Sequence, residues 1–287
     1  MNAKPILIII ALIIVSLAGV FSYNLHQPLE VDRVVDVRWL ETNCGGVKIV
    51  AVGSDQSLFK RGYIPRSSFI SYQDLIDKNS SIQGLVLKAE DFEGLMSHLG
   101  VSEKTSILLY DNQSGLFAAR AYWTLYYYGH KSILFLDGGV SSWIKAGLPL
   151  ESTTTSSISS QYKIGQLNSQ SLATLTYVKS HLYDPHVVII DARSESEYSE
   201  GHIPNAIHIE WSATLTSEGL FKNKTVLKEL FAKQGITPEK TIVTYCRTGV
   251  RGAHMWFVLS QILKYPNVML YDGSWEEWLA TSQPIER

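Results

Sequence analysis

Cysteine is scarce in this sequence: only Cys44 and Cys246 occur among 287 residues. Two cysteines cannot form the disulfide framework of a small secreted domain or the thiolate set of a zinc site. The eight histidines show no His-x-x-x-His spacing beside an acidic residue, which a histidine metal site would use. We therefore expect neither a metal ion nor any other cofactor in this protein.

The sequence also lacks an excess of charge of one sign. It has 25 basic residues against 27 acidic residues, for a net charge of −2 at pH 7. No basic stripe with interleaved aromatic residues is present, so we expect no nucleic-acid partner. The hydrophobic content of 45% is typical of a globular protein, and 287 residues are enough for two ordinary domains.

One uncharged hydrophobic run is present, at residues 5–21, directly after Lys4. At about 1.5 Å per residue, a helix of this length is at the short end of what spans a bilayer. The run predicts a signal anchor within residues 1–28, with a cleaved signal peptide as the alternative. In either case we expect Lys4 to stay in the cytoplasm and the remainder to lie outside it, periplasmic or extracellular. The protein is then held at the membrane by residues 5–21, or secreted after cleavage.

The rest of the chain repeats itself. Three pairs of motifs recur, the last two at an offset of 135 positions: Gly62-Tyr-Ile-Pro65 and Gly201-His-Ile-Pro204; Tyr110-Asp111 and Tyr245-Cys246; Asp137-Gly-Gly with Trp143 and Asp272-Gly-Ser with Trp278. This pattern predicts two domains of like fold. The Ser/Thr-rich stretch 151–161 cannot bury apolar surface, so we interpret it as an exposed linker between domains at 29–150 and 162–287.

Each copy alternates short apolar runs with helical patterns. The predicted strands are 47–52, 106–110, 132–136, 187–191, 241–245 and 268–271. The predicted helices are 89–99, 117–128, 172–182, 225–234 and 250–263. This alternation predicts an α/β fold in each domain, with a parallel sheet covered by helices on both faces.

Cys246 lies between a predicted strand and a predicted helix, in the run Cys246-Arg247-Thr248-Gly249-Val250-Arg251. A tight loop that opens a helix presents successive N–H groups and the positive end of the helix dipole to an anion. Such a loop stabilises a thiolate, the nucleophilic form of cysteine, and the two arginines add positive charge. We therefore interpret Cys246 as a reactive thiol rather than a buried structural cysteine, with Gly249 and Val250 supporting the loop.

The length of this loop bears on its ligand. In phosphatase and arsenate reductase loops, five residues separate the cysteine from the arginine that grips a tetrahedral oxyanion. Here four residues separate Cys246 from Arg251. The narrower cradle favours a terminal sulfur atom on the cysteine over a phosphate.

A second group of candidates follows the predicted strand 187–191. Asp191 ends this strand, and Arg193 lies just beyond it, at the edge where parallel α/β sheets bind ligands. Arg193 is predicted to bind an incoming oxyanion and Asp191 to support the loop; the alternative is a pair that only braces the loop. His202 is not expected to act as a base, because its counterpart in the first copy is Tyr63.

Together these motifs resemble those of the tandem-domain rhodaneses, the thiosulfate and 3-mercaptopyruvate sulfurtransferases, over roughly residues 30–287. The resemblance rests on Asp191-Ala-Arg193, Gly201-His-Ile-Pro-Asn-Ala, the loop 246–251, and Asp272-Gly-Ser with Trp278. It implies an inactive first domain and a catalytic second domain. It also implies a persulfide intermediate on Cys246, with Arg193 and Thr248 at the substrate positions.

Two departures from the family patterns bear on the sulfur donor. Animal thiosulfate sulfurtransferases carry a lysine where this chain has Thr248. Mercaptopyruvate-type loops resemble Cys-Gly-Ser/Ala-Gly-Val-Thr, whereas this chain has Arg247 and Arg251. Two cationic side chains suit a dianion, so we expect thiosulfate as the donor and cyanide or a thiol as the acceptor. 3-Mercaptopyruvate is the alternative donor.

The first copy lacks the reactive residues. Asp111 stands at the position of Cys246, and a carboxylate cannot carry sulfane sulfur. Cys44 has no comparable loop, so we interpret it as a bystander thiol, with a resolving partner for Cys246 as the alternative.

A persulfide carrier or thiol-sensing module without catalytic turnover is a further hypothesis for the whole protein.

Overall fold

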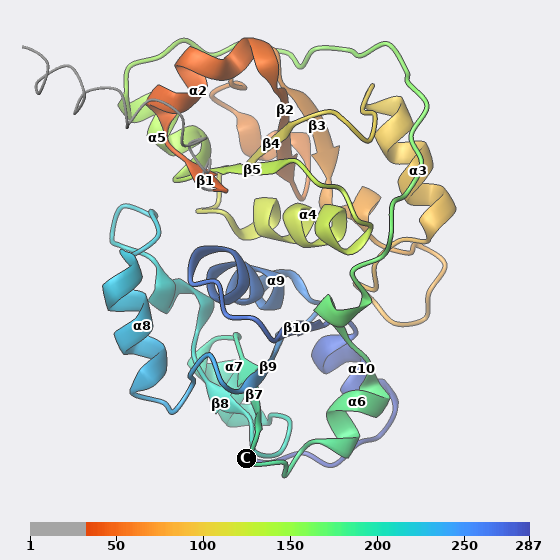
Figure 1. The fold of residues 1–287 in the computed structure, drawn as a ribbon, viewed down its shortest axis with the longest axis vertical. Coiled ribbons are helices and arrows are strands. Elements are labelled where there is room, and N and C mark those ends of the chain that lie inside the picture. Colours follow the sequence, from red (N-terminus) through yellow and green to blue (C-terminus); the bar gives the residue numbers. More distant parts are fainter. Residues whose placement is uncertain (1–32) are drawn as a thin grey trace, which may run out of the picture. The chain divides into compact units, whose positions relative to one another are not determined.

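Short runs of aliphatic residues form two five-stranded sheets, and every strand pairing in them is parallel. The computed structural model describes residues 33–287, which form a single unit (Figure 1). The predicted anchor at residues 5–21 lies outside the described residues. Within residues 33–287, no helix is both long enough and apolar enough to cross a membrane.

The two sheets have the same strand order. The first runs β1-β5-β4-β2-β3, from β1 (Val34–Val35), β2 (Lys48–Gly53), β3 (Ser68–Ser71), β4 (Ile107–Tyr110) and β5 (Ile133–Leu136). The second runs β6-β10-β9-β7-β8, from β6 (Leu172–Ala173), β7 (Val187–Asp191), β8 (Ile207–His208), β9 (Thr241–Tyr245) and β10 (Val268–Tyr271). The prediction of two parallel α/β domains of like fold is confirmed.

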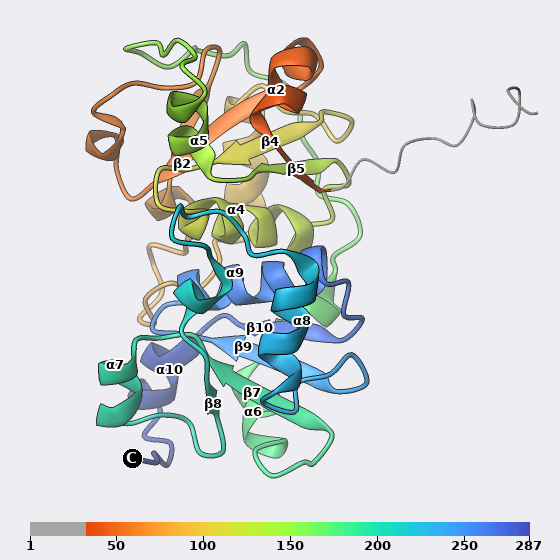
Figure 2. The same cartoon turned by 90° about the vertical axis from the view of Figure 1, so that its left-hand side faces the viewer.

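Helices cover both faces of each sheet (Figures 1 and 2). In the first domain, α2 (Val37–Asn43) and α5 (Gly139–Lys145) pack on one face, and α3 (Ala89–His98) and α4 (Leu116–Tyr127) on the other. In the second domain, α6 (Leu175–Ser180) and α10 (Ser274–Ala280) cover one face, and α8 (Lys224–Ala232) and α9 (Val250–Phe257) the other. The short helix α7 (Glu195–Glu200) follows β7.

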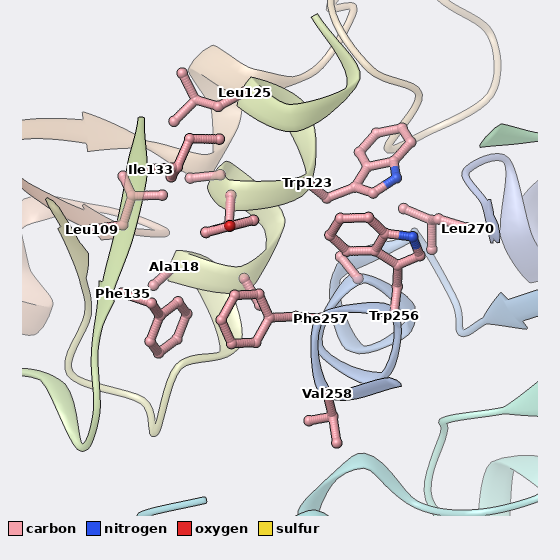
Figure 3. Close-up of a cluster of buried hydrophobic side chains, with 14 of the residues drawn as sticks. Leu109, Ala118, Trp123, Leu125, Ile133, Phe135, Trp256, Phe257, Val258 and Leu270 are labelled. Atoms are coloured by element: carbon pink, nitrogen blue, oxygen red, sulfur yellow. The ribbon is translucent and has the colours of Figure 1, made fainter. Parts of the chain in front are cut away.

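The two domains share one hydrophobic core, because α4 and α9 pack against each other (Figures 1 and 2). Figure 3 shows Phe257 of α9 pointing toward Phe135 of the first sheet, and the two rings stack with centroids 4.5 Å apart. Trp123 of α4 and Trp256 of α9 are both fully buried in the same cluster. This continuous apolar contact fixes the first domain against the loop that carries Cys246.

The two copies differ by one residue in the loop that opens the central helix. Gly115, the N-cap of α4, follows Asp111 by four positions, whereas Gly249, the N-cap of α9, follows Cys246 by three. The second copy regains this residue in a π-helical turn at Val258–Ile262, which continues α9 and holds one residue more than an α-helical turn. β5 and β10 therefore return to the offset of 135 positions.

Two segments differ in detail from the sequence expectations. The predicted helix 172–182 begins as strand β6, and α6 starts only after Thr174, whose hydroxyl caps the helix by accepting from Tyr177 N. The stretch 151–161 is mostly exposed, but it lies along the first domain, with Ser160 N donating to Ser97 O at 2.9 Å.

Candidate active site

Cys246 directly follows β9, the central strand of the second sheet, and Tyr245 pairs in register with Asp191 of β7. Because side chains alternate along a strand, Tyr245 and Cys246 project to opposite faces of the sheet. Tyr245 joins the cluster under α6 and α10, whereas Cys246 joins the core shared with α9 and the first domain, where it is 1% exposed.

The loop between Cys246 and α9 offers unpaired backbone donors. Gly249 caps the helix with φ at 81°, a left-handed conformation that glycine adopts without strain. A Cβ at this position would lie 2.5 Å from Nη1 of Arg120. No described residue accepts a hydrogen bond from the backbone N–H groups of residues 247–252. The loop and the first turn of α9 can therefore bind an anionic sulfur atom.

Arg251 supplies the cation of this loop. Its guanidinium forms a bidentate pair with Glu197 of α7, with Nη2 2.9 Å from Oε1. The hydrogen bond from Arg251 lowers the pKa of Glu197 to about 2. Burial lowers the pKa of Arg251, but its contacts with Glu197 and with the Cys246 sulfur raise that pKa above its ordinary value. Arg251 therefore stays charged beside the thiol, held in place by Glu197.

Arg193 is paired with Asp191 at the end of β7. Its Nη2 lies 2.6 Å from Oδ2 of Asp191 and 2.7 Å from the carbonyl oxygen of Gly201. The same Asp191 oxygen accepts the Tyr245 hydroxyl at 2.6 Å, and the Arg193 guanidinium lies 4.5 Å from the Trp275 ring centroid. These contacts fit the bracing alternative. Arg193 also lines a cavity with Arg247 of the Cys246 loop and with Glu197, so the expected oxyanion contact stays a prediction.

The other two loop candidates have different surroundings. Arg247 is exposed, and its Nε donates to Oε1 of Glu276 at 2.7 Å. The carbonyl oxygen of Thr248 accepts the hydroxyl of Tyr72 from the first domain at 3.3 Å. A Cβ at Gly84 would lie only 2.5 Å from that oxygen. The first domain therefore packs directly on the Cys246 loop.

A buried ion pair joins the domains beneath this loop. Arg120 of α4 is fully buried, and its Nη1 lies 2.5 Å from Oδ1 of Asp272. Its Nη2 donates to the carbonyl oxygen of Gly84 at 2.9 Å, and Val86 N donates to Oδ2 of Asp272 at 2.6 Å. The only signal of this contact in the sequence is a single arginine within an otherwise apolar helical run.

In the first domain, the carboxylate of Asp111 occupies the loop that corresponds to the Cys246 loop. Asp111 Oδ1 accepts the N–H groups of Gln113 and Gly115, both at 2.9 Å. Its Oδ2 accepts those of Phe117 at 2.8 Å and Ala118 at 3.0 Å. Burial raises the pKa of Asp111, although the four N–H groups oppose this shift. A built-in carboxyl group thus takes the place that an external anion would need.

The remaining candidates have local partners. Nδ1 of His202 lies 3.0 Å from the carbonyl oxygen of Tyr198, and its backbone pairs with Glu286. Cys44 is partly exposed and packs beside the α2 and α5 core of the first domain. No group of three or more His, Cys, Asp or Glu residues among residues 33–287 could hold a metal ion.

These features define a class of protein: two parallel α/β domains in which the second copy presents a thiol in an anion-binding loop and the first copy blocks its loop. The chain matches the family model of the rhodanese-like domain over residues 24–146 and 174–281. It belongs to the rhodanese-like domain family.

Two curated relatives match over nearly their whole length. The "Sulfur carrier protein TtuD" of Thermus thermophilus is 33% identical over 268 residues, which are 86% of this chain and 93% of that protein. The "Putative thiosulfate sulfurtransferase" of Haloferax volcanii is 30% identical over 279 residues, 89% of this chain and 96% of that protein.

Solved structures share the same fold. SseA from Escherichia coli, described as a 3-mercaptopyruvate sulfotransferase, aligns with a TM-score of 0.78 and 26% identity, over 85% of this chain and 99% of SseA. The anaerobic ergothioneine biosynthesis enzyme from Chlorobium limicola aligns with a TM-score of 0.79 over 91% of this chain and 72% of that enzyme. At 22% identity, the latter is a likeness of fold alone.

Proposed function

We propose that this protein is a sulfurtransferase that carries sulfur as a persulfide on Cys246. The observation that carries the proposal is the loop itself, in which a buried thiol directly precedes backbone N–H groups that have no described acceptor, with the Arg251 guanidinium on the first turn of the helix that follows. The names of the two curated relatives and of SseA support the same chemistry.

In the first half-reaction, the Cys246 thiolate attacks the outer sulfur of thiosulfate. A new S–S bond forms, the S–S bond of thiosulfate breaks, and sulfite leaves with its electron pair. In the second half-reaction, cyanide or a thiolate attacks the outer sulfur of the persulfide, and Cys246 leaves as a thiolate. The loop donors and Arg251 stabilise the anionic sulfur between the two steps, and no external oxidant or reductant is required.

We infer thiosulfate as the donor. Arg251 and the exposed Arg247 are paired to Glu197 and Glu276, but both belong to the Cys246 loop itself and add positive charge there, which suits a dianion. Thr248 provides a small polar side chain in the same loop. 3-Mercaptopyruvate is the alternative donor, and the likeness to SseA supports it.

A persulfide carrier is the second candidate function. It is favoured by the relative TtuD, which is named a sulfur carrier protein and is 33% identical to this chain. Such a protein accepts one sulfur atom and releases it only to a specific partner protein.

Turnover separates these functions. Full-length protein is incubated with cyanide and either thiosulfate or 3-mercaptopyruvate, and thiocyanate is measured over time. We expect many turnovers with thiosulfate and few with 3-mercaptopyruvate. Loading of Cys246 without turnover would favour the carrier, whereas failure of both donors to load Cys246 would contradict the sulfurtransferase proposal.

Arg251→Ala should lower kcat/KM for thiosulfate by roughly tenfold to a hundredfold, because a charged contact with the reacting sulfur is lost. Glu197→Gln is the matched control, since it weakens the same ion pair but keeps the cation.

Arg193→Ala should mainly lower the free energy of unfolding, because it leaves Asp191 buried without its partner. The measurements are single-turnover loading by thiosulfate and urea unfolding. If a stably folded Arg193→Ala protein were no longer loaded by thiosulfate, Arg193 would be a residue that binds the sulfur donor.

We also propose that residues 5–21 anchor the protein, with both domains outside the cytoplasm. The uncharged run has no polar face, so a helix formed by it would be stable only in lipid, unless a peptidase removes it. Lys4 is the only side-chain charge before the run, and it favours a cytoplasmic N-terminus.

Full-length protein should therefore fractionate with membranes, whereas a chain that begins at Leu29 should be released and keep full activity. Protease added outside the inner membrane should digest the Cys246 domain. Digestion only after that membrane is opened would mean that the domains face the cytoplasm. Release of a shortened chain into the medium or periplasm would favour cleavage.

A further inference from the structure

Ser274 has a strained backbone at a buried position next to the Cys246 loop. It is the first residue of α10, and its φ of 52° lies in the left-handed region that non-glycine residues rarely adopt. The equivalent residue in the first domain is Gly139, with φ at 53°. Strain of this kind persists only where surrounding contacts impose it, and such residues cluster at functional sites.

The side chain of Ser274 holds the peptide group that precedes the thiol. Its Oγ accepts a hydrogen bond from Cys246 N at 3.2 Å and donates one to the carbonyl oxygen of Tyr271 at 2.8 Å. The next residue, Trp275, donates its N–H to the carbonyl oxygen of Cys246 at 3.0 Å. Both backbone polar groups of Cys246 are therefore bound by the first turn of α10.

Only the copy that carries the thiol has this contact. In the first domain, Val140 N donates to the carbonyl oxygen of Asp111 at 2.9 Å, as Trp275 N does to that of Cys246. Gly139, however, has no side chain, and a Cβ there would lie 2.1 Å from that oxygen. The backbone also differs one residue earlier, where Gly138 has a φ of 69° and Gly273 a φ of −63°.

We propose that Ser274 is a positioning residue for the Cys246 thiol. It acts through the Cys246 peptide and not on the substrate. Among the described residues, Ser274 is the only acceptor for Cys246 N, so its hydroxyl fixes the direction in which the Cα–Cβ bond points into the loop. The proposal rests on the sulfurtransferase function, because the consequence of positioning is measured as sulfur transfer.

Ser274→Ala tests this proposal, because it removes the hydroxyl and keeps the Cβ. We expect kcat for thiosulfate-to-cyanide transfer to fall about tenfold or more, since misplacement of a reacting group by a fraction of an ångström is costly. The KM for thiosulfate should stay close to that of the wild type, because the donors of the loop and Arg251 remain. Iodoacetamide should also alkylate Cys246 more slowly, as measured by mass mapping of its peptide.

Ser171→Ala is the matched control. Ser171 is another buried serine of the same domain, and its hydroxyl donates to the carbonyl oxygen of Asn168 at 2.8 Å, away from the loop. Ser274→Gly also removes the hydroxyl, but it adopts the positive φ without strain, so it carries the test if the alanine variant does not fold.

Wild-type kcat and alkylation in both Ser274 variants would overturn the proposal, and so would an equal loss in Ser171→Ala. Failure of the sulfurtransferase function itself would be seen differently, as absence of turnover in the wild type. The alkylation rate of Cys246 requires no sulfur donor and would still report the position of the thiol.

Discussion

Cys246→Ser should abolish sulfur transfer from thiosulfate to cyanide and leave the fold intact. Serine nearly preserves the volume of this buried side chain, so the packing against the shared core is retained. Its hydroxyl does not ionise at neutral pH and cannot hold sulfane sulfur, so the covalent step is lost. We expect thiocyanate formation to fall to the level without enzyme, with urea unfolding close to that of the wild type.

Cys44→Ser is the control for this result, since it removes the other thiol of the chain and should keep full activity. Residual turnover in Cys246→Ser would mean that Cys246 is not the sulfur-carrying residue. Loss of turnover in Cys44→Ser would mean that Cys44 takes part in the reaction. A resolving role for Cys44 would appear as normal loading but slow release to a thiol acceptor.

Arg120→Met should lower the free energy of unfolding by about 3–5 kcal/mol, because removing one partner leaves Asp272 as an uncompensated buried charge. Arg120 and Asp272 are both almost fully buried, and the pair connects the two domains directly below Gly249. We also expect sulfur transfer to fall in the fraction that remains folded, because the first domain no longer holds the loop. Urea unfolding and activity measured on the same preparation give both quantities.

A second interdomain ion pair provides the matched control. Lys145 and Glu218 also connect the domains, but their side chains are 72% and 58% exposed. Exposed pairs contribute little because water solvates both charges, so Lys145→Ala should change stability very little. If Arg120→Met were as mild as Lys145→Ala, the buried pair would not be what fixes the first domain against the loop.

The central strands could be predicted from sequence because each is a run of apolar residues buried on both faces. β7, β9 and β10 have the same bounds as the predicted strands. The two-residue strands β1, β6 and β8 could not be found in this way, because pairing with a neighbouring strand defines them rather than a local pattern. The one-residue shortening of the Cys246 loop could not be seen from the repeat either. The π-helical turn after α9 compensates for it, so the motifs on both sides recur at the same spacing.

The candidate site was predictable only where it is local in sequence. The strand, loop and helix around Cys246 are contiguous, so their order already indicates an anion-binding loop. The shared contact of Arg193 and Tyr245 with Asp191 was not predictable, because it depends on which side chains of neighbouring strands point to the same face of the sheet. The contacts of Arg120 and Tyr72 with the second domain join residues more than a hundred positions apart, and no local pattern encodes them.

The most direct test of the persulfide on Cys246 is the intact mass of the full-length protein after incubation with thiosulfate, followed by peptide mapping without reductant. We expect the addition of one sulfur atom, located on the peptide that contains Cys246 and removed by cyanide as thiocyanate. An unchanged mass, or a sulfur atom located on Cys44, would contradict the assignment of Cys246 as the sulfur-carrying residue.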